Sequence, residues 1–463
     1  MTTASPAPVL SDQVARFVSE TRPEDVPAEV LERARYLILD AVGIAFASAT
    51  QPFAAVARDA LAAFGTGEHA VLGMRDRLSS RDAAVLNGVL IHGLDFDDTH
   101  LPAVAHTTSA VLPAALSAAT SANATLRELL AAYVMGVELT ARVGMAAGGA
   151  FHDVGYHPTS VAGAFGAAVA AGKLAGLDMP RLGMAQGIVG SMASGLMQFL
   201  DTGAWTKRLH PGWAALSGLT AASFAGAGWS GPPEVYEGRF GLYATHVGGH
   251  DVEPAVVAKD LGRTWELLRV AVKPYPMCHY NHAFTDAALA LRGAHEFRLE
   301  DITEIRCAIH PISRKIVCEP ADAKWKPRDE YDAKFSLPYA VSSALVRGRF
   351  TLAELEDSAL RDPHILALAG RVRILDDPES AYPEAFSGAV EIELTDGTVL
   401  HHREQINRGH EKRPLTHEDI VAKFESNIAQ AAGKTTADRV RETVLGLSPD
   451  TPATDFAEAC RAE

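Results

Sequence analysis

The chain has 463 residues, which exceeds the size at which one hydrophobic core usually stops growing, so two domains are expected. Hydrophobic residues make up 48% and charged residues 21%, a composition that excludes a disordered chain. The formal net charge is -15 and no long Lys/Arg run occurs, which argues against nucleic acid and anionic membranes as partners. An anionic substrate would therefore need a local cluster of cations in its pocket.

The N-terminus has no basic segment followed by an apolar stretch, so it does not read as a signal peptide and a cytoplasmic location is expected. The longest uncharged run, Pro211 to Pro233, is weakly hydrophobic, which favours a buried helix over a membrane span. The four cysteines contain no C-x-x-C pair, so neither a zinc site nor an iron-sulfur cluster is predicted. They are Cys278, Cys307, Cys318 and Cys460.

The first half of the chain has helical periodicity. Apolar residues recur at three- and four-residue steps from Pro27 to Ala47, with the proline suited to a first helical turn. Thr125 and Glu128 form a capping box that begins a second helix. Further helices are predicted at about 81–92, 109–121, 159–176, 181–200 and 212–228.

Small residues are dense between Gly163 and Gly172. A dinucleotide site is one interpretation of these glycines, but no apolar strand precedes them and their spacing is not G-x-G-x-x-G. Close packing of helix backbones is the preferred interpretation.

Strand-like alternation appears in the second half, at 305–309 and 390–394. An Asp-Gly pair at 396–397 follows the second run and predicts a hairpin. Near the C-terminus the helical pattern returns, with Thr416 and Asp419 placed to cap a helix.

The simplest architecture is mainly α with a second α+β domain. We expect a large helical domain formed by residues 1–267 and 405–463, interrupted by a smaller α+β domain at 268–404.

Polar residues gather directly after an apolar helix, between His92 and His106. Three carboxylates and three histidines in so short a stretch indicate either a metal site or an acid-base site. The simpler alternative is that the aspartates cap a following turn or helix and the histidines are solvated. The six residues are His92, Asp95, Asp97, Asp98, His100 and His106.

Two further segments place polar residues just ahead of predicted helices rich in small residues. His157 precedes a helix N-terminus, where free backbone N–H groups attract anions. Lys207, Arg208 and His210 precede another such helix and supply the positive cluster that an anionic substrate requires. A surface pair of Lys207 and Arg208 beside an apolar segment is the equal alternative.

The segment from Lys273 to His282 contains two prolines and lies where the helical pattern of the first half gives way to strand-like alternation, which favours a hinge. Cys278 in this segment is a weak candidate for a nucleophile. The stretch from Ala333 to Tyr339 is uninformative by itself.

Taken together and in this order, these segments resemble the MmgE/PrpD family over nearly the full length. The family includes 2-methylcitrate dehydratase, cis-aconitate decarboxylase and iminodisuccinate epimerase. The resemblance rests on Asp95-Phe-Asp-Asp-Thr with His106, Tyr156-His157-Pro, Lys207-x-Leu-His210-x-Gly212, Lys273-Pro-Tyr-Pro with Cys278 and His282, Ala333-Lys-Phe-Ser-x-x-Tyr339, and Pro414-Leu-Thr with Lys423-Phe424.

The resemblance implies a homodimer whose subunits have a helical domain built from both chain ends and an α+β lid, with the active site between them. It implies no metal and no cofactor. By carry-over, the catalytic positions are Asp95, His106, His157, Lys207, His282 and Tyr339, and the substrate-binding positions are Lys207, Arg208 and His210.

The roles expected from the resemblance are those of acid-base catalysis. Lys207 would hold substrate carboxylates, His106 and His157 would move protons, and Asp95 would orient a histidine. His282 and Tyr339 would close the pocket from the lid. The residue after His106 is Thr107, where proline is common in relatives, and this change puts the choice of substrate in doubt.

The expected function is therefore that of a lyase acting on a small polycarboxylate, with 2-methylcitrate-type dehydration placed first. Decarboxylation of the cis-aconitate type and epimerisation of the iminodisuccinate type remain alternatives, because the same residues can serve all three reactions. A carboxylate-binding protein on the same scaffold is the alternative that is not an enzyme.

Overall fold

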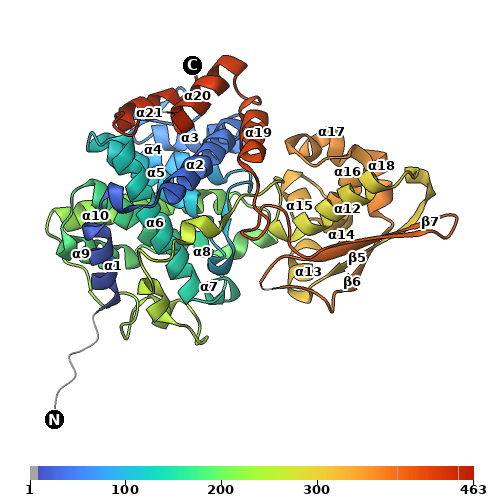
Figure 1. The fold of residues 1–463 in the computed structure, drawn as a ribbon, viewed down its shortest axis with the longest axis horizontal. Helices are drawn as coiled ribbons and strands as arrows, with labels where there is room; N and C mark the ends of the chain where they lie inside the picture. Colours follow the sequence, from blue (N-terminus) through green and yellow to red (C-terminus); the bar gives the residue numbers. More distant parts are fainter. Residues whose placement is uncertain (1–8, 383, 447) are drawn as a thin grey trace, which may run out of the picture. The chain divides into compact units, whose positions relative to one another are not determined.

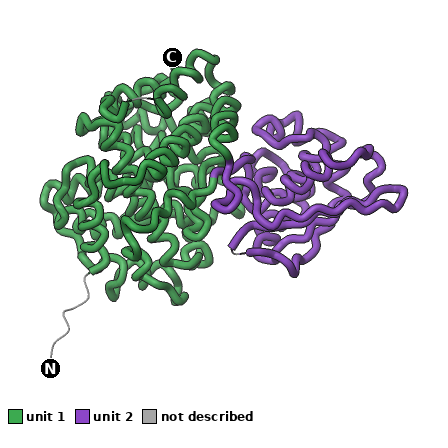
Figure 2. The backbone as a smooth tube through the Cα atoms, in the orientation of Figure 1, with its two compact units in different colours: residues 1–271, 416–463 green, residues 272–415 purple. Residues whose placement is uncertain are grey.

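The computed structural model describes residues 9–382, 384–446 and 448–463. The chain divides into two compact units (Figure 2), of which unit 1 contains residues 1–271 and 416–463 and unit 2 contains residues 272–415. The fold class is confirmed as mainly α with a small mixed sheet.

Unit 1 is helical (Figure 1). Its helices are α1 (Leu10–Glu20), α2 (Ala28–Ala49), α3 (Pro52–Ala62), α4 (Ser80–His92), α5 (Thr107–Ser121), α6 (Leu126–Ala146), α7 (Ala150–Asp153), α8 (Pro158–Leu174), α9 (Met179–Gly190), α10 (Thr206–Gly226), α11 (Leu242–Thr245), α19 (His417–Ile428), α20 (Lys434–Gly446) and α21 (Ala453–Ala459). Two short antiparallel ladders join β1 (His69–Ala70) to β2 (Arg77–Leu78) and β3 (Thr99–His100) to β4 (Val270–Ala271).

Helix α8 packs against α5, α6 and α10, and its glycines allow this close approach. A Cβ atom on Gly166 would lie 2.3 Å from the carbonyl oxygen of Gly136 in α6, and one on Gly218 of α10 would lie 2.5 Å from Ala167. Real side chains cannot come so near, so these positions need glycine. The preferred interpretation of the small residues between 163 and 172, close helix packing, is confirmed.

The C-terminal helix α19 returns to pack on α2. A Cβ atom on Gly43 of α2 would lie 2.9 Å from the Phe424 ring. The predicted caps are also confirmed, because Thr125 and Glu128 form a capping box at α6 and Thr416 and Asp419 form one at α19.

Two predicted helix boundaries were wrong. The helix expected at 181–200 ends at Gly190, and the chain then passes through Gly195, whose φ of +122° no helix accommodates. The helix expected from 212 begins at Thr206 and contains Pro211. Lys207, Arg208 and His210 therefore lie in its first turns rather than ahead of it.

Helix α6 is the one described helix that is long and apolar enough to cross a membrane, and 94% of its apolar window is buried inside the protein. The helix pair α2 and α3 passes the same test only together and is bent by 90°. Such burial is typical of a core helix.

Unit 2 contains a four-stranded sheet in the order β6-β5-β7-β8. The strands are β5 (Ile302–Ile309), β6 (Val372–Asp376), β7 (Gly388–Leu394) and β8 (Val399–Glu404). β5 pairs with β6 in parallel and with β7 antiparallel, and β7 pairs with β8 through the predicted hairpin, in which Gly397 has a φ of +85°. The hairpin is confirmed.

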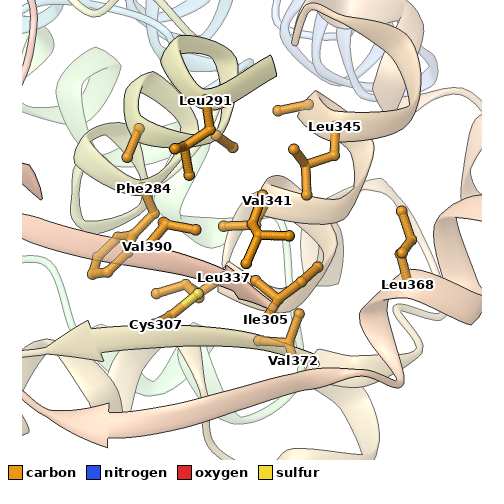
Figure 3. Packing of buried hydrophobic residues seen from close by; sticks show 14 of the residues in the cluster. Phe284, Leu291, Ile305, Cys307, Leu337, Val341, Leu345, Leu368, Val372 and Val390 are labelled. Atoms are coloured by element: carbon orange, nitrogen blue, oxygen red, sulfur yellow. The ribbon is translucent and has the colours of Figure 1, made fainter. Parts of the chain in front are cut away.

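The helices of unit 2 are α12 (His282–Ala294), α13 (Pro311–Val317), α14 (Ala321–Trp325), α15 (Glu330–Lys334), α16 (Leu337–Arg347), α17 (Asp357–Leu360) and α18 (Pro363–Ala369). Figure 3 shows how side chains from α12 and α16 meet the sheet. Phe284, Leu291 and Val341 pack there against Ile305 and Val390, and all five are buried. Burial of this apolar surface stabilises unit 2.

Candidate functional site

The candidate site of unit 1 begins where α4 ends at His92. The chain turns through Asp95, whose φ of +53° is rare for a residue other than glycine. Such backbone geometry costs about 1–3 kcal/mol and persists only where surrounding contacts hold it. The turn brings several carboxylates and imidazoles together, and the default that the histidines are merely solvated is wrong for His92, His100 and His106, which are all buried.

His92 and Asp97 form a buried pair. The Nδ1 atom of His92 lies 2.8 and 3.0 Å from the two carboxylate oxygens of Asp97, so this nitrogen carries the proton and donates it. Among the residues that the structure describes, no group hydrogen-bonds to His92 Nε2. The His92 ring lies 4.7 Å from the His106 ring and 5.6 Å from the His157 ring, measured between centroids.

His106 is held in one tautomer. Its Nδ1 atom lies 2.7 Å from the carbonyl oxygen of Asp98, and a carbonyl only accepts, so Nδ1 is the donor. In the neutral ring this leaves Nε2 as the basic nitrogen, and Nε2 lies 3.9 Å from the Asp95 carboxylate. The backbone N–H of His106 donates to the Thr159 hydroxyl at 3.0 Å, which ties this residue to the start of α8.

Lys207 forms an ion pair with Asp95. The Nζ atom of Lys207 lies 3.0 Å from Asp95 Oδ2, and both side chains are buried. The same carboxylate therefore lies between the ammonium group of Lys207 and Nε2 of His106. A substrate carboxylate would find a cation and an imidazole side by side here.

His157 and His210 form a second imidazole pair, with 3.0 Å between their Nδ1 atoms. Only one of the two atoms can carry the shared proton, so the pair disfavours a doubly cationic state. Burial, with the positive charges of His92 and Lys207, holds the pKa of His157 well below its usual range. Burial likewise lowers the pKa of His210 to about 4.

Asp98 caps α5, as the simpler interpretation of the acidic stretch predicted. Its carboxylate accepts hydrogen bonds from the backbone N–H groups of Thr107 and Thr108, at 3.1 and 3.2 Å, and from the Thr108 hydroxyl. Burial raises the pKa of Asp98 to about 7, although the Thr108 hydrogen bonds oppose this. A proline at 107 could not donate the first of these bonds, so Thr107 adds a contact to the cap.

Arg208 is buried and packs over the Phe53 ring, with its guanidinium carbon 4.5 Å from the ring centroid. Its Nε donates to the carbonyl oxygen of Gly93 at 2.8 Å. Lys207 is buried as well, so the interpretation of these residues as a surface pair was wrong. Arg208 supports the turn after α4, and its role in substrate binding stays a prediction.

The other two predicted positions, His282 and Tyr339, belong to unit 2 and are completely buried. His282 Nε2 lies 3.3 Å from the carbonyl oxygen of Met277. The Tyr339 hydroxyl donates to the carbonyl oxygen of Glu354 at 2.6 Å, and its ring packs in an apolar cluster with Phe350. Their part in the site stays a prediction.

Two sets of three buried side chains place possible metal-ligating atoms within 4.8 Å of one another. One set is His92, His106 and His157, and the other is Asp95, Asp97 and His106. In the second set the Lys207 ammonium already neutralises Asp95, which disfavours a further cation.

The sequence placed His92 and Asp97 among the six polar residues of the acidic stretch, but they were not among the carried-over catalytic positions and their pairing was not predicted. Their five-residue separation across the end of α4 allows the pairing but does not require it. Thr159 was also missed, because its hydroxyl contacts the backbone of a residue 53 positions away.

The described groups bring carboxylates, imidazoles and a buried ammonium group together in a helical unit. In the comparison with known proteins, residues 12–255 match the MmgE/PrpD N-terminal domain and residues 275–448 match the MmgE/PrpD C-terminal domain. The chain belongs to the MmgE/PrpD family.

Several relatives match nearly the whole chain. A cis-aconitate decarboxylase of Aspergillus terreus is 27% identical, covering 95% of this chain and 93% of its own. The cis-aconitate decarboxylase of Mus musculus is 29% identical over 90% of this chain and 86% of its own. A 2-methylcitrate dehydratase of Cupriavidus necator is 29% identical over 34% of each chain. These relatives support a lyase in general.

Proposed function

We propose that this chain is a lyase that acts on a small polycarboxylate by acid-base catalysis without a metal ion. The observation that carries the proposal is the Asp95 carboxylate between Lys207 Nζ, at 3.0 Å, and His106 Nε2, at 3.9 Å. A cation and a basic nitrogen directed at one point suit a substrate that carries negative charge and exchanges a proton.

Decarboxylation of a cis-aconitate-like substrate now ranks ahead of 2-methylcitrate-type dehydration. The cis-aconitate decarboxylases align with 90% or more of this chain, whereas the 2-methylcitrate dehydratase aligns with 34%. Both reactions pass through negative charge on a carbon next to a carboxylate, so one site can serve either.

The residues have distinct tasks in this proposal. Lys207 binds a substrate carboxylate and stabilises the charge that develops beside it. In decarboxylation the carbon–carbon bond to the leaving carboxylate breaks, the electron pair stays on carbon, and protonated His106 delivers its Nε2 proton there. In dehydration neutral His106 takes the proton next to the carboxylate, and a second acid protonates the leaving hydroxyl.

His157 suits the part of a neutral proton acceptor, because its low pKa keeps it uncharged near pH 7. His210 would share the accepted proton across the 3.0 Å contact. Asp95 would orient His106 and Lys207.

Incubation with cis-aconitate, 2-methylcitrate, citrate and iminodisuccinate, followed by NMR, tests the proposal. Carbon dioxide release from cis-aconitate supports decarboxylation, and loss of water from 2-methylcitrate supports dehydration. Tight binding without turnover of any compound would instead favour a carboxylate-binding protein.

The two three-residue sets near His106 favour a second candidate, metal-assisted catalysis. We expect exhaustive chelation to leave turnover unchanged, because the Lys207 ammonium already pairs with Asp95, one of the three possible ligands of the second set. Activity that disappears with chelator and returns with a divalent cation would support the metal instead.

We further propose a homodimer, as the resemblance implies. A cavity of about 620 Å³ beside His210 is bordered by exposed apolar side chains, among them Leu196, Leu209 and Trp213. Clustered apolar surface of this kind marks protein–protein contacts. Light scattering should give the mass of two chains for the wild type, and Leu209→Glu with Trp213→Lys should give one.

A further inference from the structure

The turn that carries Asp95, Asp97 and Asp98 is contacted by a buried lysine from a distant helix. Lys423 lies in α19, far from this turn in sequence, yet its Nζ atom donates to the carbonyl oxygen of Phe96 at 2.8 Å. The same ammonium group lies 3.9 Å from the centroid of the Phe96 ring. Lys423 thus contacts both the backbone and the side chain of the residue between two of the carboxylates.

Asp40 in α2 completes the contact. Its carboxylate oxygens lie 2.8 and 2.9 Å from Lys423 Nζ, and both residues are buried. A buried ion pair gives little net stability compared with an apolar pair of similar volume, because removing two charges from water is costly. Stability therefore does not explain why this position holds an ion pair.

Geometry does explain it. Asp95 adopts a left-handed backbone that is unfavourable by itself, and the hydrogen bond to Phe96 O holds the peptide unit between Phe96 and Asp97, one unit further along the turn. Asp95 pairs with Lys207, and the Asp98 carbonyl fixes the tautomer of His106. A displacement of Phe96 would move both contacts.

We infer that Lys423, held by Asp40, is a positioning residue that fixes the Asp95–Asp98 turn and, through it, His106. The contacts described for Lys423 are with Asp40 and Phe96, which are not among the proposed reacting groups. The expected effect of Lys423 on kcat rests on the proposed function. Its expected effect on the position of His106 does not.

The test removes both charges together, because removing one would leave the other buried and unpaired. In Asp40→Asn with Lys423→Met we expect kcat to fall about 100-fold, the effect of a misplacement of roughly 1 Å, while KM changes little. Lys423→Arg keeps the charge, but its larger planar head alters the contact with Phe96 O, so kcat should fall by less than in the charge-free double variant and not reach the wild-type value.

A matched control is the buried pair of Glu138 and Arg142 in α6, whose groups bond to Leu267 N and to the carbonyl oxygens of Lys259 and Thr264. Glu138→Gln with Arg142→Met removes the same kind of charges but should leave kcat within about twofold, because none of these contacts reaches the turn.

A second readout does not need turnover. In protein labelled with ¹⁵N-histidine, the Nδ1 proton of His106, assigned by its absence in His106→Gln, should exchange slowly in the wild type and in the control. It should exchange rapidly in Asp40→Asn with Lys423→Met. An unchanged His106 signal in that variant, or kcat equal to that of the wild type, overturns the inference.

Two further outcomes are also decisive. If no substrate is turned over, the proposed function fails while the His106 signal still tests the positioning role. If the charge-free variant does not fold, Lys423→Arg decides, because its larger planar head must alter the contact with Phe96 O. A slowed kcat or faster His106 exchange in Lys423→Arg then supports the inference, and wild-type values of both overturn it.

Discussion

Both units bury histidines at predicted catalytic positions, but the groups that face these side chains differ. In unit 1, His157 meets His210 and Asp95 meets Lys207, so titratable groups contact one another. In unit 2, His282 lies 3.3 Å from the carbonyl oxygen of Met277 and its ring centroid lies 4.5 Å from that of His279, while the Tyr339 hydroxyl donates to the carbonyl oxygen of Glu354. A carbonyl oxygen does not exchange protons near neutral pH. Under the proposed function the contacts of unit 1 would serve proton transfer, whereas the catalytic roles of His282 and Tyr339 stay predictions.

The largest effect expected from this comparison is at His106. His106→Gln should lower turnover by roughly two to four orders of magnitude, the usual range for losing a general acid or base. Glutamine can still donate to the Asp98 carbonyl, so the melting temperature and oligomeric state should be preserved. Near-normal kcat in this variant would remove His106 from the mechanism.

Lys207→Met should raise KM by about 10- to 100-fold, because losing one partner of a buried charged contact typically costs a few kcal/mol. Isothermal titration with substrate measures this loss directly. Lys173→Met is a matched control: Lys173 lies on α8 about 24 Å from His157, at 1.5 Å per residue, and bonds to the carbonyl oxygens of Val18 and Thr21. A loss of binding in both variants would assign Lys207 a structural role.

The imidazole pair predicts acid sensitivity in unit 1. The pKa of His210 is about 4 in the folded protein against 6.5 as its ordinary value, so the unfolded chain binds more protons between these values. Stability is therefore lost as pH falls from about 6.5 towards 4, by roughly 2 kcal/mol at pH 5 for this group.

Urea unfolding at pH 7 and pH 5 measures the effect, and His210→Gln should be the less acid-sensitive protein. The contribution of Asp98 to the pH dependence of stability has the opposite sign, because its raised pKa favours the folded state at low pH. Its contribution is common to both proteins and cancels in their difference. Equal pH dependence in the two proteins would contradict the low pKa of His210.

The smallest effect is expected in unit 2. Tyr339→Phe removes one buried hydrogen bond to Glu354 O and should cost about 1 kcal/mol of unfolding free energy. Turnover should remain within about twofold if the hydroxyl serves only the core. A large fall in kcat without a fall in stability would restore the catalytic role that the resemblance assigns to Tyr339, and would weaken the contrast between the units.

Some features of the site were predictable and some were not. The stretch from His92 to His106 was recognisable because acidic and imidazole side chains are dense there. The Asp98 cap was recognisable because capping acts over a few residues. The position of Lys207 within α10 was not predictable from the sequence. Proline is disfavoured inside a helix, so Pro211 indicated a helix that begins after it rather than one that begins at Thr206. Tertiary packing against α8 and α4 overrides that preference.

By itself the sequence determined the helical texture, the hairpin at 396–397, the capping boxes and the family motifs, because each depends on residues near one another in the chain. Only the tertiary structure decided which polar side chains meet. His157 and His210 are 53 positions apart, and Lys423 and Asp40 are 383 apart. Periodicity and caps act over one or two turns, whereas these contacts exist only once whole helices have packed.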